Sequence, residues 1–359
     1  MIDSIWIKSF RCLSELTISF SKSSFIPIVA RNNVGKTSIL EACYVLGNLK
    51  SFVTNDISQV VPFSQPSSYL GIKIPIGYRS NNYYLKVDND GKKYITLNDR
   101  PVKKKQEIMS LFRSHYISSD SLLLITSTPS FRRTKLDQVI SQFSQSYRHN
   151  LGTYKRLILQ KNKLLRSGEY SSLFNQINQQ LAALIFEIRK ERLFYLKELN
   201  QRVKHYLQKI NIIDKDFSIE YHSETIDYDT EHDILAELNK RLYKERVTKV
   251  STFGPHRDDY VFQIDNRDIN LFFSRGICRI IGYFFQLSMV DIVAFYSKLP
   301  ILLLLDEPFS EVYHDIKEVL IHHIPKEYAI IYTTTQHNEM NNISSDLLYK
   351  IDDGSLCKI

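Results

Sequence analysis

One short loop constrains the fold of this chain more than any other segment. The sequence Ala30-Arg-Asn-Asn-Val-Gly-Lys-Thr37 follows an apolar stretch, Phe25 to Ala30, and leads into Lys36 to Leu46, where apolar residues recur at helical spacing. Gly-Lys-Thr between a strand and a helix is the pattern of a phosphate-binding loop, in which backbone N–H groups and the helix N-terminus surround phosphates. The sequence therefore predicts a strand, loop and helix of an α/β nucleotide-binding fold.

The residue types of this loop suggest individual roles. Lys36 is predicted to reach the terminal phosphates of ATP, and Thr37 to hold Mg²⁺. Ala30 stands where such loops often have glycine, a change that the loop tolerates if φ stays negative. A helix cap without function is the alternative interpretation. The ATP-binding residues expected here are Ala30, Arg31, Asn32, Asn33, Val34, Gly35, Lys36, Thr37 and Ser38.

A second motif lies near the other end of the chain. The apolar run Ile301 to Leu305 ends in Asp306-Glu307, which is typical of a buried parallel strand that presents carboxylates at its C-terminal edge. Asp306 is predicted to hold Mg²⁺ through water, and Glu307 to act as a general base on the attacking water. An acidic cap on a core strand is the alternative. Together with the phosphate-binding loop, adjacent Asp and Glu favour an ATPase head of the ATP-binding-cassette (ABC) type.

The remaining patterns predict sheets followed by helices. Alternating residues in Ile2 to Phe10 and Leu13 to Phe20 indicate a strand pair, and Tyr69 to Leu97 indicates further antiparallel sheet. Helical periodicity from Arg132 to about Ile210 favours a self-packed bundle over a long coiled coil. Beyond it, patterns indicate one helix near Glu231 to Arg246, a strand at Tyr260 to Ile264 and a helix through Ile277 to Phe295. We expect an α/β ABC-type P-loop head with an antiparallel extension at 1–117 and 250–359, and an inserted α-helical lobe at 118–249.

Composition narrows the functional class. The 359 residues include 43% hydrophobic residues, which excludes global disorder, and 47 Lys+Arg against 39 Asp+Glu give a net charge of +8, which favours a polyanionic partner. The four cysteines form no Cys-x-x-Cys pair, so neither a disulfide framework nor a zinc ribbon is indicated. Since no apolar run approaches about 20 residues, we expect a cytoplasmic protein without a membrane partner.

Clusters of basic residues are candidates for contact with nucleic-acid phosphates. They are Lys103-Lys-Lys105, then Arg132, Arg133 and Lys135, and the cations of the run from Arg148 to Arg166, namely Lys155, Arg156, Lys161, Lys163 and Arg166. No recognition helix or zinc finger accompanies them, so binding to the DNA backbone is favoured over reading of bases. A solvated helix face is the alternative. His322, His323 and His337 lack metal-ligand spacing and are expected at the surface.

Several segments resemble the RecF family, and the resemblance covers nearly the whole chain. The similar segments are Phe10-Arg11, Leu40-Glu41-Ala42, Pro129-Ser-Phe-Arg-Arg133 with Leu136-Asp137, Tyr147-Arg148-His149, and above all Gly254-Pro-His-Arg-Asp-Asp259. The resemblance implies that Arg11 lies close to bound nucleotide. It also implies that Ser274 and Gly276, in the place of the signature loop, cap the ATP of a second subunit. An N-cap by Ser274 alone is the alternative for that loop.

The resemblance further implies ATP-dependent homodimerisation, binding to single-stranded or gapped DNA, RecO- and RecR-type mediators, and roles in recombinase loading and the SOS response. Any ATPase activity is expected to be slow, stimulated by DNA and used as a switch. Departures from the family occur at Ile277-Cys278, at Tyr313 in the loop Ser310 to Tyr313, and at Gln336. They leave two alternatives open: a RecF-fold DNA-binding protein that has lost its ATP switch, and another ABC-type ATPase.

Overall fold

The computed structural model describes most of the chain, and its contacts divide the chain into two compact units. The first unit comprises 1–122 and 298–359, and the second comprises 123–297. The described residues are 2–20, 23–76, 79–120, 124–169, 172–210, 215–309, 314–335, 349–352 and 355–358.

The first unit contains a six-stranded sheet that includes both ends of the chain. Its order is β15-β14-β3-β13-β12-β8, with parallel pairing from β14 through β8 and an antiparallel β14–β15 pair at the edge. The strands are β3 (Phe25–Val29), β8 (Arg113–Ser118), β12 (Ile301–Asp306), β13 (Ala329–Thr334), β14 (Tyr349–Asp352) and β15 (Ser355–Lys358). Every residue of β13 and the first five of β12 are buried, as central parallel strands require. The apolar run predicted as a buried strand is therefore β12.

A second six-stranded sheet of this unit is antiparallel, in the order β2-β1-β4-β5-β6-β7. Its strands are β1 (Ser4–Phe10), β2 (Leu13–Ser19), β4 (Ser67–Ile76), β5 (Arg79–Asp88), β6 (Lys93–Leu97) and β7 (Arg100–Pro101). Ser4 lies opposite Ser19 and Phe10 opposite Leu13, so the strand pair has the turn at Arg11-Cys12 that the sequence predicted. The antiparallel extension is likewise present.

Helix α1 (Lys36–Asn48) follows the phosphate-binding loop and packs into the core of this unit. Ile39, Leu40, Cys43 and Leu46 are fully buried, and the helix contacts β8, β12 and β1. This packing fixes the N-terminus of α1 relative to the central sheet. The unit is completed by η1 (Ile57–Val60), α2 (Lys105–Met109) and α10 (His314–His322).

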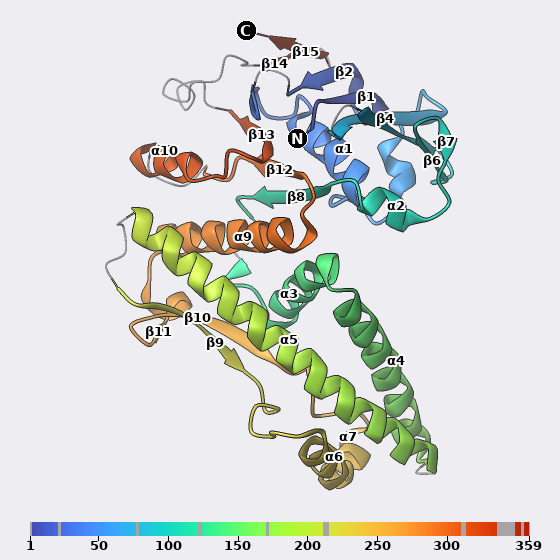
Figure 1. Cartoon of the computed structure of the whole chain (residues 1–359), viewed down its shortest axis with the longest axis vertical. Helices are drawn as coiled ribbons and strands as arrows, with labels where there is room; N and C mark the ends of the chain where they lie inside the picture. Colours follow the sequence, from blue (N-terminus) through green and yellow to red (C-terminus); the bar gives the residue numbers. More distant parts are fainter. Residues whose placement is uncertain are drawn as a thin grey trace. The chain divides into compact units, whose positions relative to one another are not determined.

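The second unit combines helices with a small sheet (Figure 1). Its helices are α3 (Pro129–Phe143), α4 (Gln145–Ser167), α5 (Ser172–Ile210), α6 (Glu231–Lys240), α7 (Leu242–Thr248), α8 (Ile269–Phe272) and α9 (Arg275–Ser297). The 39-residue α5 packs against α4, α6 and α9, so the helices cover one another as a bundle does. The three-stranded sheet is formed by β9 (Phe217–His222), β10 (Asp259–Ile264) and β11 (Arg267–Asp268).

Two details of this unit differ from the sequence prediction. Strand β9 lies inside the stretch expected to be helical, because it finds an antiparallel partner in β10, which follows it much later in the chain. The single helix expected near 231–246 is two helices, α6 and α7, joined at Arg241.

The unit boundaries also differ from the expected ones. Residues 250–297, expected in the head, form contacts within the second unit instead. The reason is packing: α9 contacts α5 and α3, and β10 contacts β9 and α3. Whether residues 250–297 contribute to ATP binding stays a prediction.

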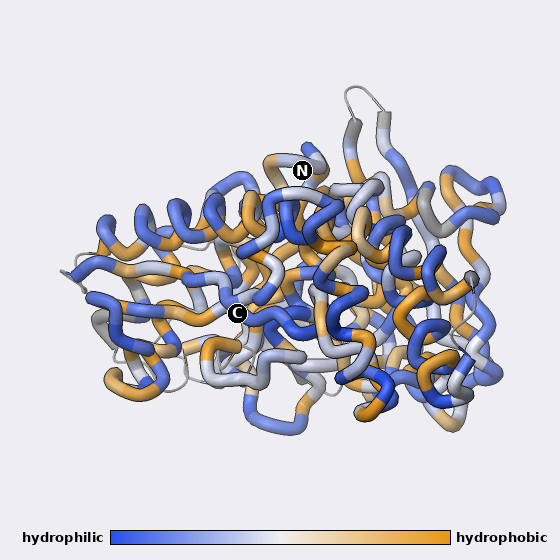
Figure 2. The backbone as a smooth tube through the Cα atoms, turned by 90° about the horizontal axis from the view of Figure 1, so that it is seen from below, coloured by the Kyte–Doolittle hydropathy of each residue, from blue (hydrophilic) through white to orange (hydrophobic). Residues whose placement is uncertain are grey.

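Helix α9 is long and apolar enough to cross a membrane by length and composition alone. However, 78% of its most apolar window is buried within the protein, as in the core helix of a soluble protein. Figure 2 shows how hydropathy alternates along the chain, with hydrophilic and hydrophobic residues on opposite sides of helical turns. One apolar helix buried in this way is weak evidence for a membrane span.

Candidate nucleotide-binding site

The phosphate-binding loop connects the end of β3 to the start of α1. Gly35 has φ = 105°, and a Cβ atom there would lie 2.9 Å from Sγ of Cys12, so both the conformation and the space require glycine. Asn33 also has a positive φ, 65°, which asparagine tolerates better than most residues. Ala30 is not among the residues with positive φ, so its Cβ is compatible with the turn.

Lys36 is the first residue of α1, and its side chain is only 6% exposed. Its Nζ donates hydrogen bonds to the carbonyl oxygen of Ala30 (2.9 Å) and to Oδ1 of Asn32 (3.3 Å), and it forms an ion pair with Glu307. The ammonium group is therefore held over the loop by three acceptors.

Asp306 lies at the end of β12, beside the ends of β8 and β13. Its Oδ2 accepts hydrogen bonds from Thr37 Oγ1 and from the hydroxyl of Tyr116, each 3.0 Å, and its Oδ1 accepts one from Thr333 (2.7 Å). Burial, followed by the nearby charge of Asp306, raises the pKa of Tyr116, so its hydroxyl remains a donor. Thr37 and Asp306, 269 positions apart, thus meet because parallel strands end at one edge of the sheet.

The chemistry of this edge fits a magnesium ion. A carboxylate and a hydroxyl oxygen are hard donors, and Mg²⁺ in nucleotide sites usually takes one or two protein oxygens, with phosphates and water as the other ligands. Among the residues that the structure describes, no group of three or more His, Cys, Asp and Glu could hold a metal by itself. At Thr37 and Asp306, phosphates and water would supply the remaining ligands of a metal ion.

Arg11 is placed by an ion pair with the first helix. Its Nε and Nη2 donate to the two carboxylate oxygens of Glu41, each at 2.7 Å, and Glu41 also accepts a hydrogen bond from Ser51. The hydrogen bond from Arg11 to Glu41 raises the pKa of Arg11. Glu41 is buried, so the pair fixes the turn between β1 and β2 against α1. Contact between Arg11 and nucleotide stays a prediction.

Ser274 and Gly276 belong to the second unit, at the N-terminus of α9. Ser274 is exposed, and its Oγ accepts a weak hydrogen bond from the backbone N–H of Ile277 (3.4 Å), as an N-cap does. A role of Ser274 toward the nucleotide of a second subunit stays a prediction. Ser310 to Tyr313, Gln336 and His337 lie outside the described residues.

The Gly254 to Asp259 segment has a buried ionic network in the second unit. Asp258 accepts hydrogen bonds from Arg192 (2.8 Å), Tyr221 and Ser223, and Arg192 also donates to Asp137 (2.9 Å). Gly254, with φ = 124°, lies where a Cβ would come within 2.6 Å of the Tyr154 hydroxyl. The segment thus ties helices α3, α4 and α5 to β10.

Two cations expected to contact phosphates are buried instead. Arg132 is paired with Asp259 (Nε to Oδ1, 2.9 Å), and Lys161 is fully buried with Glu245 (2.8 Å). Both face the interior because the helices that carry them pack against the segments that supply these acids. The phosphate-contact prediction is therefore wrong for these two residues.

Three neighbours of the site were given no role by the sequence analysis. Tyr116 was not recognised because β8 is a short mixed strand without a distinctive apolar pattern. Glu41 was named only as part of a family segment. The sequence signal for its role was an acidic residue on the helix that follows the loop. Cys12, 3.7 Å (Sγ to Oγ) from Ser38, gave no sequence signal at all.

Comparisons with known proteins agree with this fold. A family model described as an AAA domain matches residues 4–251. The DNA replication and repair protein RecF of Lachnoclostridium phytofermentans is 26% identical over 100% of this chain and 99% of its own length. The protein of the same name from Clostridium botulinum, strain Okra, is 27% identical over 100% of both chains.

Solved structures with a similar fold cover the full chain as well. The recombination mediator protein RecF-ATPrS in the RecFOR pathway gives a TM-score of 0.85 at 24% identity, covering 100% of this chain and 98% of that one. An Smc head bound to the C-winged helix domain of ScpA gives 0.59 at 17% identity, covering 100% of this chain and 97% of the other. The fold is that of RecF and of the ABC-type ATPase heads of Smc proteins.

Proposed function

Because the chain belongs to the AAA domain family and is homologous to RecF over its full length, we propose that it is an ATP-binding protein of DNA replication and repair. The observation that carries this proposal is the convergence of Lys36, Thr37, Asp306 and Glu307 at one sheet edge, beside a loop whose conformation requires glycine at position 35. RecF relatives bear that role in their names, and two solved structures similar to this chain are named RecF-ATPrS and RecF-ATP. A cytoplasmic location follows from this role.

Within the site, the loop amides and Lys36 bind the phosphates of ATP. Thr37 and Asp306 hold Mg²⁺, which neutralises phosphate charge when bound. Glu307 orients the attacking water and accepts its proton. This role requires that the ion pair between Lys36 and the Glu307 carboxylate first breaks. Hydrolysis on this scheme is slow and serves to end a bound state.

Substitution of Lys36 tests ATP binding. Lys36→Ala removes the ammonium group from the terminal phosphates, and charge-assisted hydrogen bonds of about 1.5–3 kcal/mol predict a loss of roughly 10- to 100-fold in ATP affinity. Lys50→Ala, an exposed lysine after α1, is the matched control. Equal ATP affinity of Lys36→Ala and wild type, measured by calorimetry on folded protein, would remove the basis of the proposal.

DNA binding is supported by a stripe of exposed cations on α4. The stripe, here called the α4 basic stripe, consists of Arg148, Lys155, Arg156, Lys163 and Arg166. Helical spacing places these five side chains along one side of a 23-residue helix. Such a row suits contact with successive backbone phosphates, without reading of bases.

The salt dependence of DNA binding tests this part. If all five cations of the α4 basic stripe contact duplex phosphates, the slope of log K against log salt is about −4 to −5. The double substitution Arg156→Ala with Lys163→Ala should then reduce the slope by about 2. An unchanged slope would place the DNA contact elsewhere.

On this proposal, ATP-driven dimerisation depends on Ser274. Mediators of the RecO and RecR type are further partners. If Ser274 and Gly276 cap the nucleotide of a second subunit, Mg-ATP raises the dimer fraction, and Ser274→Arg abolishes that rise. Sedimentation with a nonhydrolysable ATP analogue measures it. A wild type that binds ATP but stays monomeric favours the alternative, a DNA-binding protein without a working switch.

A further inference from the structure

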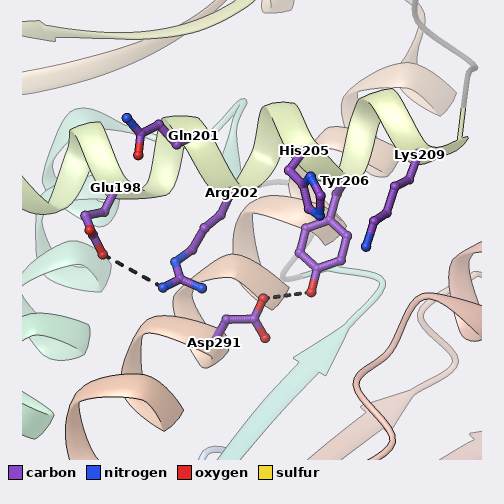
Figure 3. Close-up of a pocket in the computed structure, with 7 residues that line it drawn as sticks. All are labelled: Glu198, Gln201, Arg202, His205, Tyr206, Lys209 and Asp291. Atoms are coloured by element: carbon purple, nitrogen blue, oxygen red, sulfur yellow. Dashed lines mark hydrogen bonds and ion pairs between the residues drawn. The ribbon is translucent and has the colours of Figure 1, made fainter.

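A pocket lies between the C-terminal half of α5 and α9 in the second unit, away from the Gly254 to Asp259 network. Its volume is about 390 Å³, within the range of small-ligand sites. Figure 3 shows Arg202, His205 and Lys209 extending from α5 along the side that faces α9. Two carboxylates, Glu198 and Asp291, also line it. Neither the phosphate-binding loop nor the α4 basic stripe uses these residues.

The carboxylates of the pocket are already engaged. Asp291 accepts a hydrogen bond from the hydroxyl of Tyr206 (2.7 Å), and Glu198 lies 3.9 Å from Arg202 and accepts a bond from Tyr296 (3.4 Å). Lys209 forms no ion pair within the part of the chain that the structure describes. Lys209 is exposed and Arg202 is half-buried beside Glu198, so the pocket holds two cationic side chains next to its engaged carboxylates.

A row of aromatic rings continues from this pocket. Phe143, Phe194, Tyr195, Phe295 and Tyr296 contact one another with ring centroids 5.0–5.5 Å apart. We call these five side chains the aromatic ledge. Phe194 is 50% exposed and Phe295 is 63% exposed, so two rings of a packed cluster remain open to solvent.

Arg202 joins the ledge to the pocket. Its guanidinium carbon lies 5.7 Å from the centroid of Phe295, and the same side chain lines the pocket. Two exposed rings, a guanidinium group and a lysine thus follow one another along α5 and α9. Rings that stack on bases and cations that contact phosphates are the two components of sites for single-stranded nucleic acid.

We propose that the aromatic ledge and the adjoining pocket bind single-stranded DNA, with bases stacked on Phe194 and Phe295 and phosphates contacted by Arg202 and Lys209. The proposal rests on the DNA-binding role proposed above and adds a second surface to it. Duplex DNA does not suit this surface, because its bases are stacked on one another and cannot cover a protein ring. An acidic peptide would use the cations but would not need two exposed rings.

Fluorescence anisotropy with labelled single-stranded and duplex oligonucleotides of equal length tests the site. Phe295→Ala should weaken binding of the single strand about tenfold and leave duplex binding within twofold. Phe295→Trp should restore single-strand binding, since a larger ring still stacks. Quenching of 2-aminopurine in the single strand, expected for wild type, should fall in Phe295→Ala.

The matched control is Phe63→Ala, which removes a fully exposed ring in the first unit and should change neither measurement. Lys209→Ala should weaken single-strand binding by a smaller factor and reduce its salt slope. The proposal is overturned if Phe295→Ala binds single strands like wild type, if it loses single strand and duplex equally, or if polyglutamate displaces the single strand at equal charge concentration.

These outcomes separate the two proposals. If wild type binds ATP and DNA and Phe295→Ala has the same affinity for single-stranded DNA, the aromatic-ledge proposal is wrong and the proposed function is unaffected. A wild type that binds neither single-stranded nor duplex DNA with or without Mg-ATP contradicts the DNA-binding role itself, and the ledge proposal with it.

Discussion

The carboxylate of Glu307 forms an ion pair with Nζ of Lys36, so the proposed general base and the proposed phosphate ligand neutralise each other. Glu307 has φ = 43°, an uncommon conformation for this residue type, and its N–H donates to the carbonyl of Thr333 (3.1 Å). The backbone at the end of β12 thus turns the Glu307 side chain toward the loop. Terminal phosphates of ATP would compete with Glu307 for Lys36, which links occupancy of the site to release of the base.

Glu307→Gln is expected to bind ATP several-fold more tightly and to hydrolyse it about 100-fold more slowly. The neutral amide forms no ion pair with Lys36, so the ammonium charge of Lys36 is available to the phosphates without competition. Hydrolysis slows because an amide cannot accept the proton of the attacking water. Calorimetry and single-turnover hydrolysis measure the two effects. Glu327→Gln, an exposed acid of the same unit, is the control. Weaker ATP binding together with unchanged turnover would show that Glu307 is not the base.

Cys12 should report ATP binding directly. Its exposed Sγ lies 3.7 Å from Oγ of Ser38 and next to Gly35, whereas Cys43 and Cys278 are buried. We expect saturating Mg-ATP to slow maleimide labelling of Cys12 several-fold, because phosphates in the loop cover the thiol.

Cys357, exposed near the C-terminus, provides the internal control, since its labelling rate should not respond to ATP. Peptide mass spectrometry distinguishes the two sites. Labelling of Cys12 at one rate with and without ATP would mean that nucleotide does not occupy this loop.

Arg192→Leu is expected to lower the free energy of unfolding of the second unit by about 3–5 kcal/mol. The substitution leaves two buried carboxylates, Asp137 and Asp258, without their shared cation. Hydrogen exchange of α3 and α5 measures the loss within this unit. Lys190→Ala, an exposed neighbour, should stay within about 0.5 kcal/mol of wild type. A similarly small effect of Arg192→Leu would mean that the network does not stabilise the unit.

His256 should make stability fall as the solution becomes acidic. Burial, with the nearby charges of Arg257 and Arg133, lowers the pKa of His256 below the ordinary 6.5, while its ring contacts Tyr154 and Ser251. The unfolded chain therefore binds a proton at a higher pH than the folded one. The stabilising contribution is complete above about pH 6.5 and is lost as the pH falls toward the folded-state pKa.

The expected slope is at most about 1.4 kcal/mol per pH unit for this one proton. Denaturant unfolding between pH 7.5 and 5.5 should show a smaller pH dependence for His256→Gln than for wild type. Gln160→Ala changes an exposed residue of the same unit that does not titrate, and it should keep the wild-type slope. Identical slopes for all three proteins would contradict a depressed pKa at His256.

Local patterns in the sequence were enough to predict the phosphate-binding loop, α1, the strand pair at the N-terminus and the buried strand β12. Each of these depends on residues close together in the chain: glycine at a positive φ, apolar residues at helical spacing, and an unbroken apolar run. The pairing of Thr37 with Asp306 could be predicted as well, because the rule that parallel strands end at one edge supplies the long-range contact.

Only the tertiary structure decided which cations face solvent and which strands meet. Arg132 and Lys161 look like surface residues in the sequence, but distant acids, Asp259 and Glu245, pair with them inside the second unit. β8 enters the central sheet, and residues 250–297 join the helices rather than the head. Burial and strand order depend on partners that are distant in the chain, such as Asp259, which is 127 positions from Arg132, and no local pattern records them.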